Sequence, residues 1–218
     1  MRILCAGCSF TKDYWYKTWP DYIGATKNIG IRGAGPDLVG KRTLIELQEN
    51  KYDMCIVLWP NVSRVDWFID SNENKTQALE VASWQKQAKR TFVNLHGQEV
   101  DMNGYSSSGW RRGYLEQYYK TYYSESQHQI NLWYYVHTFQ MYCKIHNIAN
   151  LSFFVDSESV CGKSPFNIEQ DNVVFDQGKG FHEMLTSKGH EPKKELGWHF
   201  DTEAQEDFAN FVTANLIV

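Results

Sequence analysis

The chain has 218 residues, a length that suits one large domain with a substantial buried core. Its formal net charge of −4 shows no basic excess, so no nucleic-acid partner is expected. No apolar run approaches the length of a membrane span, and the apolar start at residues 1–7 is too short for a signal peptide, so we expect a cytoplasmic protein with no membrane partner.

Short apolar runs alternate with helical segments along the chain. Residues 2–7, 27–31 and 53–59 are predicted strands, and residues 38–48 carry helical spacing. The run at 53–59 is continuously apolar, as expected for a central parallel strand buried on both faces. Residues 151–155 form a fourth such run. This alternation predicts an α/β fold: a three-layer α/β/α sandwich with a mainly parallel, flavodoxin-like sheet.

The stretch from about 75 to 146 fits the alternation less well. Residues 101–113 are rich in Gly and Ser, and residues 114–146 form a long aromatic-rich helical segment with a break expected near Ser124. We interpret the stretch as a helical, aromatic insertion within a single domain that spans residues 1–218. Aromatic residues make up 15% of the chain, so some of the rings are expected to line a binding surface.

The cysteines do not suggest a disulfide framework. There are five of them, an odd number, and they lie far apart in the sequence. Cys5 and Cys8 have redox spacing, but Cys5 is expected to point into the core from the first strand. We therefore expect reduced cysteines that pack as small apolar side chains. The sequence indicates no oligomeric state.

A serine follows the first predicted strand. Ser9 lies within the sequence GCSFT at residues 7–11, which would place it at the carboxyl edge of a parallel sheet, where open α/β folds bind ligands. If a helix followed, its amino terminus would stabilise negative charge at the serine. Taken alone, a serine at the end of a strand is more often a cap or turn residue.

A histidine precedes the last predicted helix. His199 lies in the sequence GWHFDTEA at residues 197–204, and either Asp201 or Thr202 can cap the helix that follows. Taken alone, this histidine is more simply explained as a packed or solvated residue.

Gly33 and Asn61 follow the second and third predicted strands. The ends of parallel strands meet at one edge, so a nucleophile, a backbone amide and a side-chain amide would gather there with Ser9. An acyl-transfer site needs these parts, because amides can hold the oxyanion of a tetrahedral intermediate. The order Ser9, Gly33, Asn61, His199 is far more specific than any one of its members.

In this order of motifs the chain resembles the SGNH hydrolase (GDSL esterase/lipase) superfamily. The Gly-Asp-Ser block of that family corresponds to residues 7–9, its second-block glycine to Gly33, its third-block asparagine to Asn61 and its last-block histidine to His199. The resemblance implies a serine esterase with Ser9 as nucleophile and His199 as base. It implies an oxyanion hole made by the Ser9 and Gly33 amides and the Asn61 side chain, and it requires no metal or organic cofactor.

The expected substrate is a small-molecule or glycan ester, and the aromatic excess favours an O-acetyl group on a carbohydrate. The residues expected to bind it are Trp59, Arg64, Tyr105 and Trp110.

Three positions depart from the family pattern. Cys8 replaces the usual Asp, Trp59 replaces the third-block Gly, and Leu196 occupies the place of the acid three residues before the histidine. Glu195 is the nearest carboxylate on the amino-terminal side and is our candidate third catalytic residue. The alternative is a Ser–His dyad whose ring is oriented by a backbone carbonyl or a water. Losing the acid can cost several powers of ten in rate, so a weak site is expected.

Two other interpretations stay open. A non-catalytic SGNH-like module would bind a glycan or a protein through the aromatic insertion, and the departures at positions 59 and 196 favour it. A flavodoxin-like nucleotide binder would need a phosphate loop, but the near match at residues 35–42 has Arg42 where Ser or Thr should hold magnesium. The histidines at 182, 190 and 199 suit no standard metal-ligand spacing.

Overall fold

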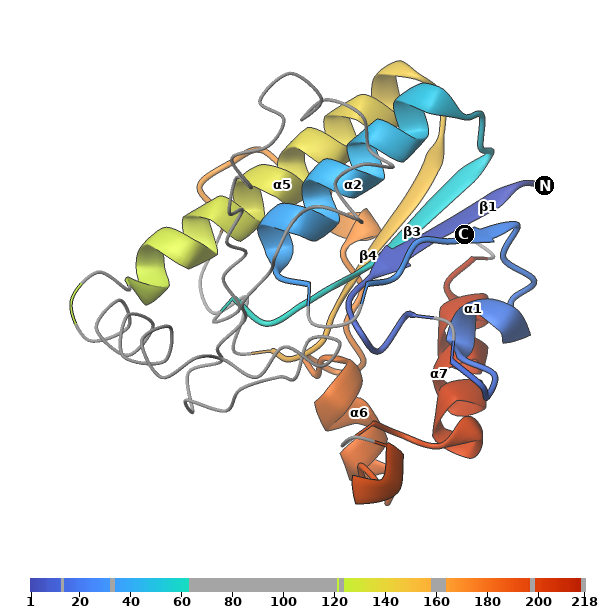
Figure 1. Ribbon diagram of the computed structural model, residues 1–218. Coiled ribbons are helices and arrows are strands. Elements are labelled where there is room, and N and C mark those ends of the chain that lie inside the picture. The colour runs from blue at the N-terminus through green and yellow to red at the C-terminus, as the bar shows by residue number, and fades with distance from the viewer. Residues whose placement is uncertain are drawn as a thin grey trace, which may run out of the picture.

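The centre of the protein is a parallel sheet. The computed structural model describes residues 1–12, 14–31, 34–62, 121, 124–157, 164–196 and 199–216. In this part of the chain, four parallel strands lie in the order β2-β1-β3-β4 (Figure 1). They are β1 (Ile3–Gly7), β2 (Lys27–Asn28), β3 (Met54–Trp59) and β4 (Ala149–Phe154). The predicted α/β class and parallel sheet are confirmed, and the order is that of the first four strands of a flavodoxin-like sheet.

The strand register brings the strand ends to one edge. β1 and β3 are buried at every position, as their continuous apolar sequences predict. Gly7 pairs with Leu58, and Leu58 pairs with Phe153. Since the central strands end level with one another, the segments that follow them leave the sheet side by side.

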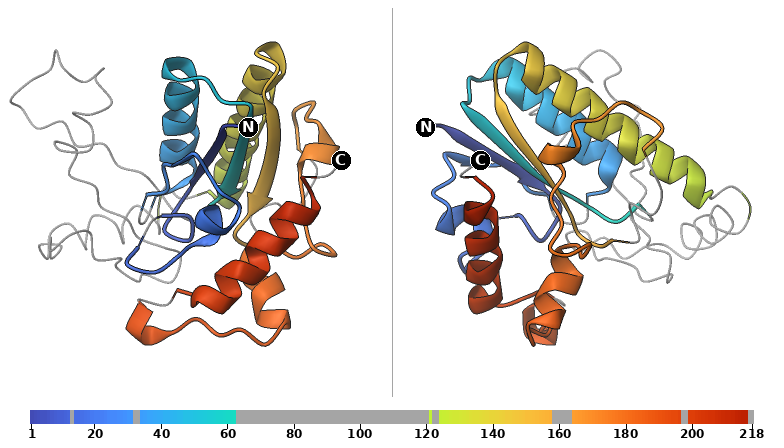
Figure 2. Two further views of the ribbon diagram at one scale, coloured as in Figure 1. Left: turned by 90° about the vertical axis from the view of Figure 1, so that its right-hand side faces the viewer. Right: turned by 180° about the vertical axis from the view of Figure 1, so that it is seen from behind.

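Helices cover both faces of the sheet (Figures 1 and 2). The helices α2 (Pro36–Glu49) and α5 (Glu125–Ile145) pack together on one face, and α1 (Trp19–Tyr22) packs with α7 (Thr202–Ala214) on the other. The helix α6 (Phe181–Ser187) packs against α7, and two short 3-10 turns, η2 (Gln170–Asn172) and η3 (Lys194–Leu196), complete the described elements. Among the described helices, none is long and apolar enough to cross a membrane.

Helix α5 belongs to the sandwich rather than to an insertion. Ser124 caps it, with Oγ accepting the amide of Gln127 at 3.3 Å, at the position where the sequence suggested a break. The helix packs against α2 and β4 and precedes β4 in the chain. Residues 125–145 of the predicted insertion are therefore a helix of the sandwich, and its residues 75–120 lie outside the described part of the chain.

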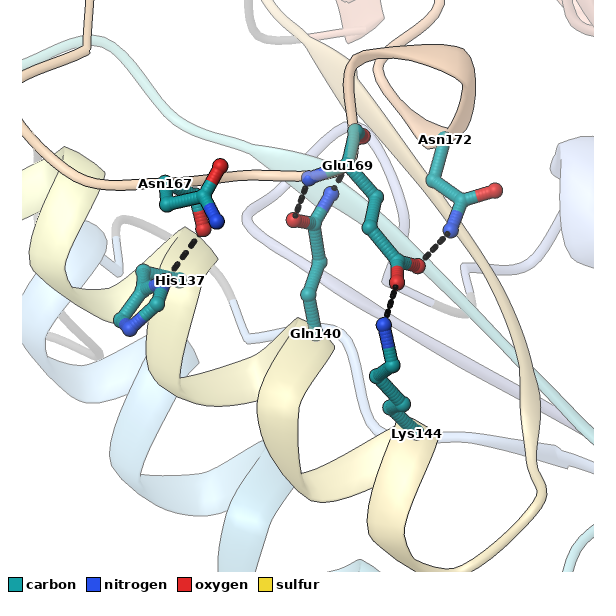
Figure 3. A network of polar contacts seen from close by, with 6 residues as sticks. All are labelled: His137, Gln140, Lys144, Asn167, Glu169 and Asn172. Carbon is teal, nitrogen blue, oxygen red and sulfur yellow. Dashed lines mark hydrogen bonds and ion pairs between the residues drawn. The ribbon is translucent and has the colours of Figure 1, made fainter.

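A network of hydrogen bonds and an ion pair connects α5 to the segment that leads to η2 (Figure 3). The buried side chain of Gln140 donates to the carbonyl of Glu169 at 3.0 Å and accepts the Glu169 amide at 2.8 Å. The Glu169 carboxylate in turn pairs with Lys144 at 2.7 Å. Gln140 thus satisfies both backbone groups of Glu169, as a neighbouring strand would. These bonds hold the segment after β4 against α5.

Candidate functional site

Ser9 lies in a tight turn directly after β1. The amides of Thr11 and Lys12 both donate to the Cys8 carbonyl, at 3.0 and 3.1 Å, and this closes a single helical turn. No helix continues from it, because the next one, α1, begins only at Trp19. Among the described residues after Ser9, only one helical turn is present where a helix was considered, and no helix precedes α1. The Ser9 amide takes no part in the two hydrogen bonds that close the turn, as is usual for the first amides of a helical turn.

The loop after β2 packs closely against this turn. The Asn28 side chain donates to the Thr11 carbonyl at 2.6 Å and accepts the Gly30 amide at 2.9 Å. A Cβ atom on Gly30 would lie 2.5 Å from the Lys12 nitrogen, so only glycine allows this approach. We did not single out Asn28 or Gly30 from the sequence, whereas Gly33, which we did, lies outside the described residues.

A backbone carbonyl orients the imidazole of His199. Its Nδ1 lies 2.9 Å from the carbonyl oxygen of Leu196. A carbonyl only accepts, so Nδ1 carries the proton and Nε2 of the neutral ring is the proton acceptor. The segment is anchored on both sides: the Lys193 amide donates to the His199 carbonyl at 2.9 Å, and Asp201 caps α7 as predicted, accepting the Ala204 amide at 3.1 Å.

Two aromatic rings, one in the Ser9 turn and one just after it, contact this imidazole. The ring centroids of Phe10 and Tyr14 lie 5.0 and 5.4 Å from that of His199. Phe10 is the residue next to Ser9, so the fold brings the serine turn and the histidine together across nearly the whole chain. Both are sheltered, with Ser9 only 5% and His199 only 8% exposed.

Asn61 lies one strand away at the same edge and is held by a carboxylate. Its Nδ2 donates to Asp156 Oδ2 at 2.6 Å, as the register of β3 and β4 allows. A carboxylate only accepts, so this bond directs the nitrogen of the Asn61 amide, and not its oxygen, toward β4. We did not identify Asp156 from the sequence. It follows the apolar run 151–155, and Ser9 was identified by the same signal, a polar residue that follows an apolar run.

The start of α6 supports the end of β4. A Cβ atom on Gly180 would lie 2.6 Å from the backbone of Asp156. Glu183 accepts the Gly180 amide at 2.6 Å and the Ser157 hydroxyl at 2.6 Å. Burial acts to raise the pKa of Glu183, but these hydrogen bonds outweigh it and the pKa is lowered overall. An ionised Glu183 therefore joins α6 to the segment that carries Asp156.

Two predicted site residues have other positions. Trp59 is fully buried in β3, where its indole N–H donates to Ser152 Oγ at 3.1 Å, so the prediction that it binds substrate is wrong. Glu195 is exposed in η3, and the partner of Nδ1 is the carbonyl of Leu196 and not the Glu195 carboxylate. The predicted substrate-binding residues Arg64, Tyr105 and Trp110 lie outside the described residues.

The other candidate groups have structural partners or are buried. His190 pairs with Asp207 at 2.9 Å, and burial lowers the pKa of His182 although Asp156 and Glu183 act to raise it. Within the described ranges, no group of three or more His, Cys, Asp or Glu side chains could hold a metal ion. Cys5 and Cys8 are both fully buried.

The described elements define an open, doubly wound α/β protein. The chain passes from β1 to β2 on one side and then to β3 on the other, so the loops that carry Ser9 and Asn61 diverge at a topological switch point. Crevices at such points are where α/β sheets of this kind bind their ligands. Comparison with models of known families, with curated proteins and with solved structures found no match to this chain.

Proposed function

We propose that the protein is a serine ester hydrolase of the SGNH type in which Ser9 is the nucleophile and His199 its base. The observation that carries the proposal is the 2.9 Å contact between His199 Nδ1 and the Leu196 carbonyl. It fixes the tautomer in which Nε2 accepts a proton, which is the role of the histidine in serine hydrolases. The packing of Phe10 against the ring keeps this base next to the serine turn.

In the proposed reaction, Ser9 Oγ attacks the ester carbonyl and its proton passes to Nε2 of His199. The tetrahedral intermediate then collapses, and the leaving alcohol takes the proton from His199. A water, deprotonated by the same histidine, attacks the acyl-enzyme and releases the carboxylic acid and free Ser9. The Leu196 carbonyl remains bonded to Nδ1 throughout and stabilises the imidazolium in place of a carboxylate.

The oxyanion is assigned to the Ser9 amide, the Gly33 amide and the Asn61 side chain. The Ser9 turn leaves that amide outside its own bonds, and Asn61 has two amide hydrogens, of which Asp156 takes one. Asp156 thus holds the Asn61 side chain in one orientation, and this side-chain amide is assigned to the oxyanion. Such preorganised donors supply much of the rate enhancement in acyl transfer.

The test is covalent labelling with a fluorophosphonate, which reacts with an activated serine. The protein should be labelled, the modified peptide should contain Ser9, and Ser9→Ala should not react. Labelling should also disappear in His199→Ala. An unlabelled wild-type protein would contradict the proposal and favour the non-catalytic module that binds a glycan or a protein.

Replacing Glu195 by glutamine is expected to lower turnover by less than about tenfold, because the Leu196 carbonyl already orients the imidazole. The steady-state rate on an aryl ester measures the effect, and His199→Ala in the same assay shows the size of a true loss. A loss of about 10³-fold in Glu195→Gln would instead make Glu195 the acid of a triad.

A further inference from the structure

The carboxylate of Glu183 in α6 does more than cap its own helix. Its Oε2 accepts the Gly180 amide at 2.6 Å, which is one of the bonds of a capping box. The same oxygen also accepts the Ser157 amide at 2.9 Å, and Oε1 accepts the Ser157 hydroxyl at 2.6 Å. The two bonds to Ser157 add nothing to the cap of α6, and they join the helix to the segment that follows β4.

These bonds hold the chain on one side of Asp156, and a second contact from α6 holds it on the other. Ser157 follows Asp156 directly, whereas Val155 precedes it and accepts the His182 amide at 2.8 Å with its carbonyl. A Cβ atom on Gly180 would lie 2.6 Å from Asp156 Cα, so the two backbones also approach closely. The backbone of Asp156 therefore lies between two neighbours that are both hydrogen-bonded to the first turn of α6.

The side chain of Asp156 extends this restraint to Asn61. Its Oδ2 accepts a hydrogen bond from Nδ2 of Asn61 at 2.6 Å, and Asn61 follows the neighbouring strand β3. Hydrogen bonds weaken steeply with misalignment, and a functional group has to be held within about 0.5 Å of its working position. A shift of the Asp156 backbone would therefore turn the side-chain amide that we assign to the oxyanion.

Glu183 is ionised at neutral pH, which strengthens its bonds to Ser157. Burial acts to raise the pKa of Glu183, but the bonds from Ser157 and Gly180 lower it overall. Hydrogen bonds to a carboxylate are roughly twice as strong as those between neutral groups. The position of Ser157, and with it that of Asp156, thus depends on this carboxylate.

We infer that Glu183 is a positioning residue for the oxyanion site and that it acts through residues 156 and 157 on the side-chain amide of Asn61. The inference rests on the proposed ester hydrolysis, in which Asn61 binds the oxyanion. A helix cap alone would give Glu183 an effect on stability and none on the chemical step. A positioning residue instead affects kcat and leaves KM nearly unchanged, because the oxyanion forms only after the substrate is bound.

The test is a double-mutant cycle on the kcat for a short-chain aryl ester, with Asn61→Ala, Glu183→Ala and the double variant. Asn61→Ala should lower kcat by about 10²-fold, as the loss of an oxyanion donor does. Glu183→Ala should lower kcat by about tenfold and change KM by less than about twofold. In the Asn61→Ala background, Glu183→Ala should change kcat by less than about twofold, because the group that it positions is gone.

Two further variants keep the test decisive if thermal unfolding shows that Glu183→Ala is not folded. Ser157→Ala removes one of the three bonds, so it should lower kcat by about threefold, and only when Asn61 is present. Glu183→Gln should keep kcat within about threefold of the wild type, because its amide oxygen can accept both backbone amides while the Ser157 hydroxyl accepts a bond from Nε2.

Glu169 provides the matched control, since its carboxylate also joins the segment after β4 to a helix. It pairs with Lys144 of α5, and the nearby Val173 bridges to Ser152 in the middle of β4, away from the carboxyl end of the strand. Glu169→Ala should therefore leave kcat unchanged.

Each of three results would overturn the inference: an unchanged kcat in Glu183→Ala, an equal loss of kcat with and without Asn61, or a rise in KM alone. In these cases the wild-type protein would still react with fluorophosphonate at Ser9. Failure of the hydrolase proposal gives a different pattern. The wild-type protein would then be unlabelled and would not hydrolyse the ester, and the inference would be overturned with it.

Discussion

Replacing Ser9 by alanine is expected to lower the turnover of a short-chain aryl ester by about 10⁴-fold or more, because the variant has no nucleophile to form the acyl-enzyme. His199→Ala should cause a similar loss, since nothing then accepts the serine proton. The two residues act as one unit, so the double variant should be little slower than either single one. Initial rates of ester hydrolysis measure the loss of turnover, and thermal unfolding shows whether each variant is folded. The unfolding midpoint of Ser9→Ala should differ from that of the wild type by no more than about 2 °C.

A matched histidine provides the control for this experiment. His190 pairs with Asp207 and lies outside the proposed site, so His190→Ala should retain the wild-type rate. If Ser9→Ala kept more than about a tenth of the wild-type turnover, Ser9 would not be the nucleophile. If only His199→Ala were slow, the histidine would serve a reaction with another nucleophile.

The positions of the strand ends could be predicted from two features of this chain: its continuous apolar runs and the parallel pairing of its strands. Continuous apolar runs identify β1, β3 and β4, and parallel pairing then requires their following residues to share an edge. That reasoning placed Ser9 and Asn61 correctly at the carboxyl edge. Asp156 is the second residue after β4, as Ser9 is after β1 and Asn61 after β3, so the same reasoning would also have identified Asp156.

Other features leave no pattern in the sequence. The partner of His199 is a backbone carbonyl, and any residue type at position 196 would supply one. Residues 125–145 were assigned to an insertion because the stretch 75–146 did not fit the alternation of strands and helices, whereas Trp133 and Phe139 of α5 are buried in the sandwich. Trp59 and Trp15 are chemically identical, and only their positions in a central strand and in a loop decide that one is buried and the other exposed.

Gly7→Ala is expected to destabilise the protein by about 3 kcal/mol, because it overpacks the end of β1. An added Cβ would lie 2.2 Å from Thr11 Oγ1 and 2.8 Å from the Leu58 carbonyl oxygen. The carbonyl belongs to the neighbouring central strand and cannot move away cheaply, so the turn that carries Ser9 has to shift. Urea unfolding measures the stability, and aryl-ester turnover should fall with it.

Gly178→Ala separates this steric effect from the general cost of replacing a glycine. Gly178 has a φ of +81° in an open turn with no atom within 4 Å of an added Cβ, so its replacement should cost only the roughly 1–2 kcal/mol of a left-handed backbone. Adding Thr11→Ala to Gly7→Ala should recover part of the stability, since it removes the nearest clashing atom. Thr11 Oγ1 is buried and makes no hydrogen bond to the described residues, so the second change breaks none of those bonds. If Gly7→Ala is no more destabilising than Gly178→Ala, the close contact between the Ser9 turn and β1 does not exist in the folded protein.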